Sequence, residues 1–191
     1  MSKRPLRLSA GASCFIPVEF VLQFECSTGM AAQIVREAIM GDKGGNPALN
    51  EFRKKYPEKF EEEKQVFSKI HPGSRIFIGT ACAEPQHLVN ALVNYIESNP
   101  KAFFDAEVLQ VWTLGVAAYT QEKFKSNFRH NSFFIGDNTR GAVNQGLADY
   151  TPIFLSQVPQ LFRRGVVPVD VALIQTSLPD RHGYLLSLIH I

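Results

Sequence analysis

One pattern occurs three times in the chain: a short apolar strand runs into a loop of small and polar residues. The copies are Arg75-Ile-Phe-Ile-Gly-Thr-Ala-Cys-Ala-Glu-Pro-Gln, Ser132-Phe-Phe-Ile-Gly-Asp-Asn-Thr-Arg-Gly and Val169-Asp-Val-Ala-Leu-Ile-Gln-Thr-Ser-Leu-Pro-Asp-Arg-His-Gly. In a parallel sheet the carboxyl ends of the strands share one edge, and open α/β folds bind ligands there. The pattern therefore predicts a ligand site at residues 79–85 (the first loop), 136–141 (the second loop) and 176–183 (the third loop).

The regular part of the chain alternates helices and strands. The turn-rich stretch at residues 41–47 separates a region of poor periodicity from it, so we expect an irregular N-terminal appendage over residues 1–53 and an α/β domain over residues 54–191. Periodicity, prolines and glycines predict helices near 57–72, 85–99, 121–128, 140–148 and 156–165, and strands at 75–80, 107–114, 132–135, 150–155 and 169–176. This alternation favours a mostly parallel sheet with flanking helices and right-handed crossovers.

Composition excludes several classes of partner. With 191 residues, 45% hydrophobic and 20% charged, the chain is long enough for one well-buried domain of ordinary soluble type. The net charge of +2 is too small to favour nucleic acid or a membrane surface. No P-loop, dinucleotide fingerprint or Gly-x-Ser-x-Gly elbow is present, so nucleotide hydrolysis, nicotinamide chemistry and serine hydrolysis lose support.

The cysteines indicate a reducing compartment. Cys14, Cys26 and Cys82 are odd in number and lack the spacing of metal ligands, so we expect no disulfide framework and no metal site. No apolar stretch reaches the ~18 residues that a bilayer-spanning helix needs. We expect a cytoplasmic protein, with a mitochondrial one as the alternative because several basic residues precede the first acid, Glu19.

The first loop offers small residues and the start of a helix. Small side chains at Gly79, Thr80, Ala81 and Cys82 let the backbone approach a ligand, and a helix beginning at Pro85 leaves unpaired N–H groups that stabilise an anion or a developing oxyanion. The alternative is that the small residues only allow tight packing between strand and helix. Two side chains carry the same ambiguity: Glu84 is a catalytic carboxylate or a favourable charge at a helix start, and Cys82 a thiolate nucleophile or a small packing residue.

The second loop is denser in polar groups. Arg140 can hold a carboxylate or phosphate with two hydrogen bonds, while Asn138 and Thr139 offer donors. The alternative is an Asx turn with a helix cap, with Arg140 paired to a nearby acid. In the third loop, Asp180 and His182 suit acid–base chemistry or a tight turn before Gly183.

At these loops the sequence resembles the N-terminal half of the acetyl-CoA hydrolase and 4-hydroxybutyrate CoA-transferase family, within the class I CoA-transferases. The similarity covers roughly residues 54–185. It is carried by Ile76-Phe-Ile-Gly-Thr-Ala-Cys-Ala-Glu-Pro-Gln-His-Leu-Val, Gly136-Asp-Asn-Thr-Arg, Gly146-Leu-Ala-Asp-Tyr-Thr-Pro-Ile-Phe-Leu-Ser-Gln-Val-Pro-Gln-Leu-Phe and Val169-Asp-Val-Ala-Leu-Ile-Gln, followed by Ser177-Leu-Pro-Asp-Arg-His-Gly-Tyr with Leu178 where the family usually has Pro.

The resemblance implies an α/β domain with a mostly parallel sheet, the first of two similar domains in a CoA-transferase-like architecture. In such enzymes a glutamate of the second domain attacks the acyl-CoA thioester and becomes a glutamyl-CoA thioester. An incoming carboxylate then takes over the CoA, or water releases it. Acyl-CoA and a small carboxylate are then the substrates. Coenzyme A is part of the substrate, and no cofactor is expected. The intact protein is expected to be a homo-oligomer. The first domain supplies substrate contacts, which map to Gly79, Thr80, Ala81, Cys82, Asn138, Thr139 and Arg140.

The sequence departs from the family after Tyr184, where the family continues through a Ser-Leu-Gly step. Here Leu185-Leu-Ser-Leu-Ile-His-Ile191 follows instead. We therefore expect a chain cut short before the second domain, without the nucleophilic glutamate, that binds weakly, turns nothing over alone and exposes apolar surface where a partner domain packs. The alternatives are a non-catalytic subunit that pairs with a separately encoded catalytic subunit, and a sugar-phosphate isomerase on a related fold.

Overall fold

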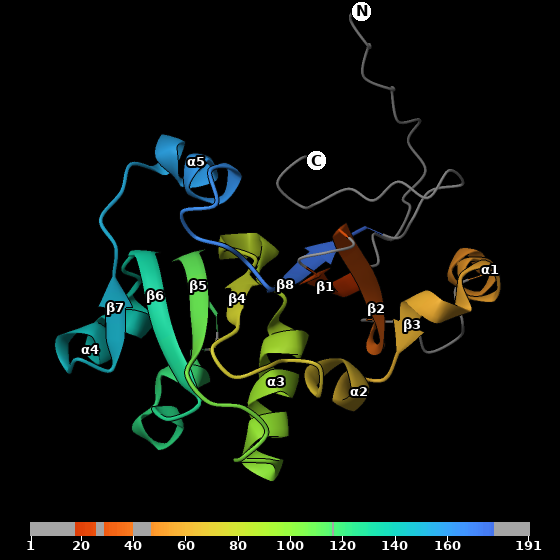
Figure 1. Ribbon diagram of the computed structural model, residues 1–191, viewed down its shortest axis with the longest axis horizontal. Helices are drawn as coiled ribbons and strands as arrows, with labels where there is room; N and C mark the ends of the chain where they lie inside the picture. The colour runs from red at the N-terminus through yellow and green to blue at the C-terminus, as the bar shows by residue number, and fades with distance from the viewer. Residues whose placement is uncertain (1–17, 26–28, 40–46, 116, 178–191) are drawn as a thin grey trace, which may run out of the picture.

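The computed structural model of the chain describes residues 18–25, 29–39, 47–115 and 117–177. Within them one eight-stranded sheet has the order β3-β2-β1-β8-β4-β5-β6-β7 (Figure 1). The strands are β1 (Val18–Glu25), β2 (Gly29–Ile39), β3 (Phe60–Glu61), β4 (Arg75–Ile78), β5 (Ala106–Trp112), β6 (Phe128–Phe134), β7 (Ala148–Tyr150) and β8 (Val171–Thr176). Strands β8, β4, β5, β6 and β7 are all parallel to their neighbours within this set. The predicted α/β class with a mostly parallel sheet and flanking helices is confirmed.

Strands β1 and β2 extend the sheet beyond its parallel part. β1 pairs antiparallel with both β2 and β8, and β2 pairs parallel with β3. Strands β1 and β2 fall within residues 1–53, where poor periodicity predicts an irregular appendage, so the described part of that segment is more regular than predicted. Its pairing partner β8 lies about 150 residues away, which no local pattern reveals. The division of the chain at residue 53 stays a prediction.

Helix α3 (Gln86–Ser98) covers one face of the parallel strands. Its apolar residues recur at helical spacing, and the buried ones are Leu88, Val89, Leu92, Val93 and Ile96. They pack with Ile76 and Ile78 of β4, Val108 of β5 and Leu173 of β8. Burial of each such side chain contributes about 2 kcal/mol. This packing fixes α3 against the sheet, and the loop between β4 and α3 with it.

Helix α5 (Val158–Arg163) packs on the opposite face. Its Phe162 ring packs edge-on against Phe77 of β4, with centroids 5.5 Å apart, and against Phe133 of β6 at 6.3 Å. Alternate residues of one strand therefore face different helices, as expected of a sheet buried on both sides. The remaining helices are α1 (Pro47–Lys55), α2 (Glu63–Phe67) and α4 (Asp137–Asn144).

Two predicted helices differ in the structure. The segment 57–72 forms a 3₁₀ turn (Pro57–Lys59), β3 and α2, because the Glu62 backbone N–H is held by the Gln65 side chain and a new helix begins there. The segment 121–128 forms only a 3₁₀ turn (Glu122–Phe124) before β6 begins. The buried Asn127 side chain donates to the carbonyls of Pro100 and Phe103, which ties this segment to the loop before β5.

The other elements agree with the prediction in kind and differ mainly at their ends. Helix α4 begins three residues earlier than predicted and ends before Gly146, whose φ of +72° is the left-handed conformation that terminates helices. Strand β7 shares only Tyr150 with the predicted strand at 150–155, and it begins at Ala148, where the sequence predicts the end of a helix. None of the described helices is long and apolar enough to cross a membrane.

Candidate functional site

The first and second loops lie at the same edge of the sheet, on either side of the turn that follows β5. Parallel pairing of β4 with β5 and of β5 with β6 brings their carboxyl ends together. Ser177, the last described residue of the third loop, follows β8, which pairs parallel with β4. The common edge predicted from the sequence is therefore present. Asp180 and His182 lie outside the described residues.

Thr80 joins the first loop to β5. Its hydroxyl donates to the carbonyl of Trp112 at 2.8 Å and accepts from the Trp112 backbone N–H at 2.7 Å. One side chain thus satisfies both backbone groups at the end of β5, and the two strand ends cannot separate without breaking two hydrogen bonds.

The neighbouring small residues bring the backbone into close approach. Gly79 donates its N–H to the carbonyl of Leu173 in β8, and a Cβ on it would lie 2.5 Å from the Ala83 carbonyl oxygen, so only glycine fits without a shift. Ala81 has φ of +53°, a left-handed conformation that costs an alanine about 1 kcal/mol. The Cys82 side chain is exposed, so it does not act as a buried packing residue.

A buried polar cluster lies beneath the first loop. The fully buried Gln110 of β5 donates to the carbonyl of Gly79 at 3.0 Å. Its carbonyl oxygen accepts from the Thr113 hydroxyl at 2.6 Å and the Tyr119 hydroxyl at 2.9 Å. Because a satisfied buried network is rigid and an incomplete one is costly, these bonds fix the strand end in place. Sequence reasoning missed this cluster, since a glutamine in an apolar strand carries no motif.

Glu84 is the only buried carboxylate among the residues that the structure describes. It is 3% exposed, and its Oε2 accepts hydrogen bonds from the backbone N–H groups of Leu114 at 3.2 Å and Gly115 at 3.0 Å. The other oxygen, Oε1, is also buried and has no partner among the described residues. Burial, and secondarily the charge of Glu84, raise the pKa of the Tyr119 hydroxyl far above its usual value.

The second loop forms the first turn of α4. Gly136 precedes the helix, and a Cβ there would lie 2.6 Å from the Thr113 carbonyl oxygen, so the loop approaches the turn after β5 closely. The Asn138 side chain donates to the carbonyl of Gly115 at 2.6 Å. Thr139 is buried and its hydroxyl donates to the carbonyl of Gly136 at 3.3 Å.

Arg140 remains accessible to a ligand. Its guanidinium lies 3.6 Å from the Asp137 carboxylate, and the two side chains are 59% and 102% exposed. A pair this exposed contributes little to stability, so the guanidinium is not committed to the fold. The nearby acid proposed from the sequence as the alternative partner is therefore present, but the contact leaves Arg140 at the surface.

Large apolar side chains are exposed at this edge of the sheet. Trp112 ends β5, and Phe134, which pairs with it across the strands, ends β6; they are 45% and 41% exposed. Tyr150 at the end of β7 is exposed as well, and so are Leu114, Phe154 and Leu155. The aromatic surface therefore borders the joined loops.

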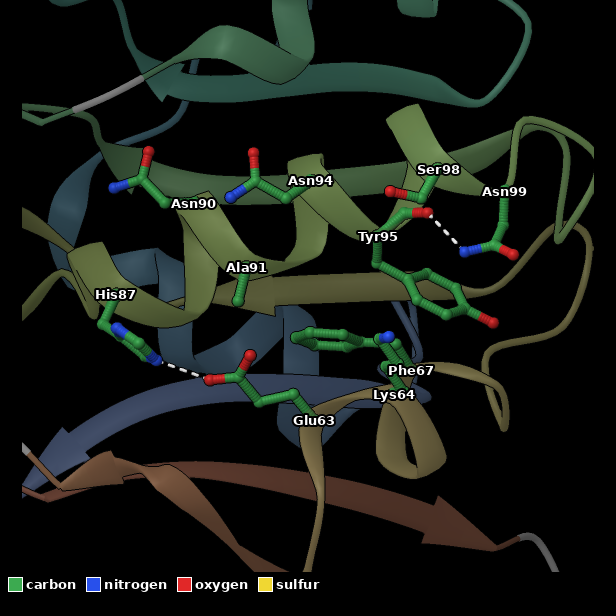
Figure 2. Close-up of a pocket in the computed structure, with 10 residues that line it drawn as sticks. All are labelled: Glu63, Lys64, Phe67, His87, Asn90, Ala91, Asn94, Tyr95, Ser98 and Asn99. Atoms are coloured by element: carbon green, nitrogen blue, oxygen red, sulfur yellow. Dashed lines mark hydrogen bonds and ion pairs between the residues drawn. The ribbon is translucent and has the colours of Figure 1, made fainter.

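A hollow lies away from the joined loops, between α2 and α3 (Figure 2). Figure 2 shows the His87 imidazole pointing toward the Glu63 carboxylate, with which it makes a contact of 2.5 Å, while Asn90 and Asn94 lie further along α3. None of the predicted site residues lines this hollow. Across the described residues no cluster of three or more potential ligands could hold a metal ion.

Comparison with known proteins decides what the joined loops belong to. Residues 46–189 match the acetyl-CoA hydrolase/transferase N-terminal domain. The chain belongs to this family. The match includes both described loops in full, so the family named from the resemblance is confirmed.

Curated relatives of this acetyl-CoA hydrolase/transferase N-terminal domain are CoA-transferases. The chain is 44% identical over 134 residues to the 4-hydroxybutyrate coenzyme A transferase of Clostridium kluyveri, covering 70% of this chain and 30% of that protein. It is 37% identical over 130 residues to the succinyl-CoA:acetate/propanoyl-CoA:succinate CoA transferase of Fasciola hepatica, covering 68% and 26%. The chain thus spans less than a third of the length of these relatives.

A solved structure has the same fold. The crystal structure of RipA from Yersinia pestis superposes with a TM-score of 0.56 at 22% identity, covering 70% of this chain and 32% of that one. At this identity the likeness concerns the fold alone.

Proposed function

We propose that this domain forms one wall of the active site of an acyl-CoA:carboxylate CoA-transferase or acetyl-CoA hydrolase. The first and second loops would contact the acyl-CoA, and a glutamate of a second domain would form the glutamyl-CoA intermediate. Support comes from the family and from one observation: two loops distant in sequence are both bonded to Gly115, in the turn after β5, at the carboxyl edge of the parallel strands.

The chemistry assigned to this wall is to bind and orient the substrate. The first turn of a helix has backbone N–H groups without acceptors inside the helix, and such groups stabilise negative charge that develops on a thioester carbonyl oxygen. The exposed Arg140 guanidinium is suited to a phosphate of coenzyme A or to the carboxylate of the acceptor acid. The nucleophile would come from outside the described residues.

Binding and turnover test different parts of the proposal. The chain should bind acetyl-CoA weakly, measured by titration with NMR of backbone amides, with the largest shifts in residues 79–85 and 136–141. It should show no CoA transfer from acetyl-CoA to a carboxylate by itself. Turnover by the chain alone would contradict the assignment of the nucleophile to another domain.

A chimera tests whether the wall is competent. Residues 46–189 would replace the matching segment of the Clostridium kluyveri 4-hydroxybutyrate coenzyme A transferase, to which the chain is 44% identical. We expect CoA-transferase activity from the chimera, and at least about tenfold less with Arg140→Gln, because a charged hydrogen bond is lost. The matched control is Arg164→Gln in the same chimera, since Arg164 lies at the end of α5 on another part of the domain. Equal activity of both variants would mean that Arg140 does not contact the substrate.

A further inference from the structure

Glu84 connects the first loop to the turn after β5 over a long stretch of chain. Its partners Leu114 and Gly115 are 30 and 31 residues away, and both donate backbone N–H groups to the same oxygen, Oε2. Helix α3 begins at Gln86 after Pro85 as N-cap, and no side chain caps it. The carboxylate therefore holds the neighbouring turn and is not the cap of the helix that follows it.

The bonded turn passes this constraint on to the second loop. The Gly115 carbonyl accepts the Asn138 side-chain N–H at 2.6 Å, while the Gly115 N–H donates to Glu84 at 3.0 Å. One peptide segment is thus held from both sides, by Glu84 of the first loop and Asn138 of the second. Displacement of Gly115 would release both contacts.

A negative charge is an expensive means of fixing a turn. An ionised carboxylate loses its hydration on burial, and Glu84 recovers part of it through two N–H donors at Oε2 while Oε1 has none among the described residues. A glutamine could accept the same two hydrogen bonds without the charge. Helix α3 begins two residues further on, at Gln86, so Glu84 stands just before the N-terminus of that helix. What the charge adds is stronger, charge-assisted bonds to the two amides.

We propose that Glu84 is a positioning residue of the candidate site: it fixes the Leu114–Gly115 turn and, through the Gly115 carbonyl, the orientation of the Asn138 side chain. Glu84 touches no reacting atom in this assignment. Its role in CoA transfer rests on the proposed function, whereas its coupling to Asn138 does not.

Three variants of the full chain separate positioning from packing. Glu84→Met fills the same space but accepts no strong hydrogen bond, and Glu84→Gln keeps the acceptor but loses the charge. Glu122→Gln is the matched control, because Glu122 is an exposed partner of Lys125 far from these loops. The readouts are hydrogen exchange of the Gly115 amide, the NMR shifts of the Asn138 side-chain amide and the Kd for acetyl-CoA.

With Glu84→Met we expect about tenfold or faster exchange at Gly115, shifted Asn138 signals and about tenfold weaker acetyl-CoA binding. Glu84→Gln should fall between this variant and wild type, and Glu122→Gln should match wild type. If Glu84→Met does not fold, Glu84→Gln decides: exchange at Gly115 at least about twofold faster than in wild type supports the proposal.

The proposal is overturned if a folded Glu84→Met leaves Gly115 exchange and the Asn138 signals unchanged, or if Glu84→Gln behaves like the control when Glu84→Met is unfolded. Failure of the proposed function looks different. In that case acetyl-CoA would produce no response even in the wild-type chain, while Glu84→Met would still move the Asn138 signals.

Discussion

The first and second loops occupy the same edge of the sheet but differ in how the fold uses their side chains. In the first loop, the polar atoms of Thr80 and Glu84 are hydrogen-bonded to the backbone of β5 and of the turn after it. Gln110 of β5 donates a further hydrogen bond to the loop at Gly79. In the second loop, Arg140 stays at the surface. The comparison teaches that the first loop gives the site its shape, while the second retains a charge available to a ligand. Substitutions at Gln110, His130, Thr80 and Arg140 test the two sides of this difference.

The largest effect is expected at Gln110, below the first loop. Gln110→Ala leaves the Gly79 carbonyl and the hydroxyls of Thr113 and Tyr119 without their partner and opens a cavity. We expect a loss of about 4 kcal/mol in the free energy of unfolding. Urea denaturation measures it. A loss under about 1 kcal/mol would show that the cluster does not hold the first loop.

The next largest effect on stability is expected at His130, in the strand that leads into the second loop. His130 of β6 is buried, its Nε2 lies 2.7 Å from the Ser132 hydroxyl, and burial lowers its pKa from 6.5 to about 4. The unfolded chain therefore binds a proton at a pH where the folded chain does not. Stability from this residue is complete above pH 6.5 and is lost as the pH falls toward 4.

The loss should amount to about 3 kcal/mol between these two pH values. Denaturation series at several pH values would measure it in wild type and in His130→Gln, which should lack this component of the pH dependence. His71→Gln, at an exposed histidine, should behave as wild type. Parallel pH profiles for wild type and His130→Gln would mean that His130 is not held neutral.

A smaller effect on stability is expected at Thr80, near the start of the first loop. Thr80→Val keeps the shape of the side chain but removes the hydroxyl that bonds both backbone groups of Trp112. We expect about 2 kcal/mol less stability and faster hydrogen exchange at the Trp112 amide. Thr120→Val is a useful comparison, because the Thr120 hydroxyl donates to a local carbonyl only. An equal cost for both would weaken the view that Thr80 joins the two strand ends.

The smallest effect on stability is expected at Arg140. Arg140→Gln should change the free energy of unfolding by less than about 0.5 kcal/mol, because the ion pair with Asp137 is exposed. Acetyl-CoA binding should nevertheless weaken about tenfold. Urea denaturation and titration of the same preparation compare the two quantities. A variant that loses stability but keeps its affinity would reverse the roles assigned to the two loops.

Much of the fold follows from local sequence patterns. Short apolar runs before loops predict β4, β6 and β8, and the spacing of Leu88, Leu92 and Ile96 predicts α3. Where prediction fails, a distant contact decides: β1 depends on pairing with β8, and the segment before β6 depends on Asn127 bonding to the loop before β5. Propensity gives no information about such partners.

The sequence predicts where the candidate site lies, but it does not predict the hydrogen bonds that hold the site together. The strand-and-loop pattern correctly predicts that Thr80 and Asn138 lie at one edge, whereas their substrate contacts stay a prediction. The pattern also suggests that Glu84 caps a helix or reacts, and the structure shows it bonded to a turn 30 residues away. Gln110 was missed, because its three partners come together only in the folded chain.

The borders of the described sheet restrict how another protein can attach to it. β3 at one border has two residues and β7 at the other has three. The two borders differ in what lies behind them: β3 pairs with only Ile34 and Val35 of the eleven-residue β2, whereas β7 itself presents few backbone groups to which a neighbouring chain could add a strand. On the β7 side, attachment of another protein therefore depends on side chains, and the exposed rings of Trp112 and Phe134 offer apolar area for it.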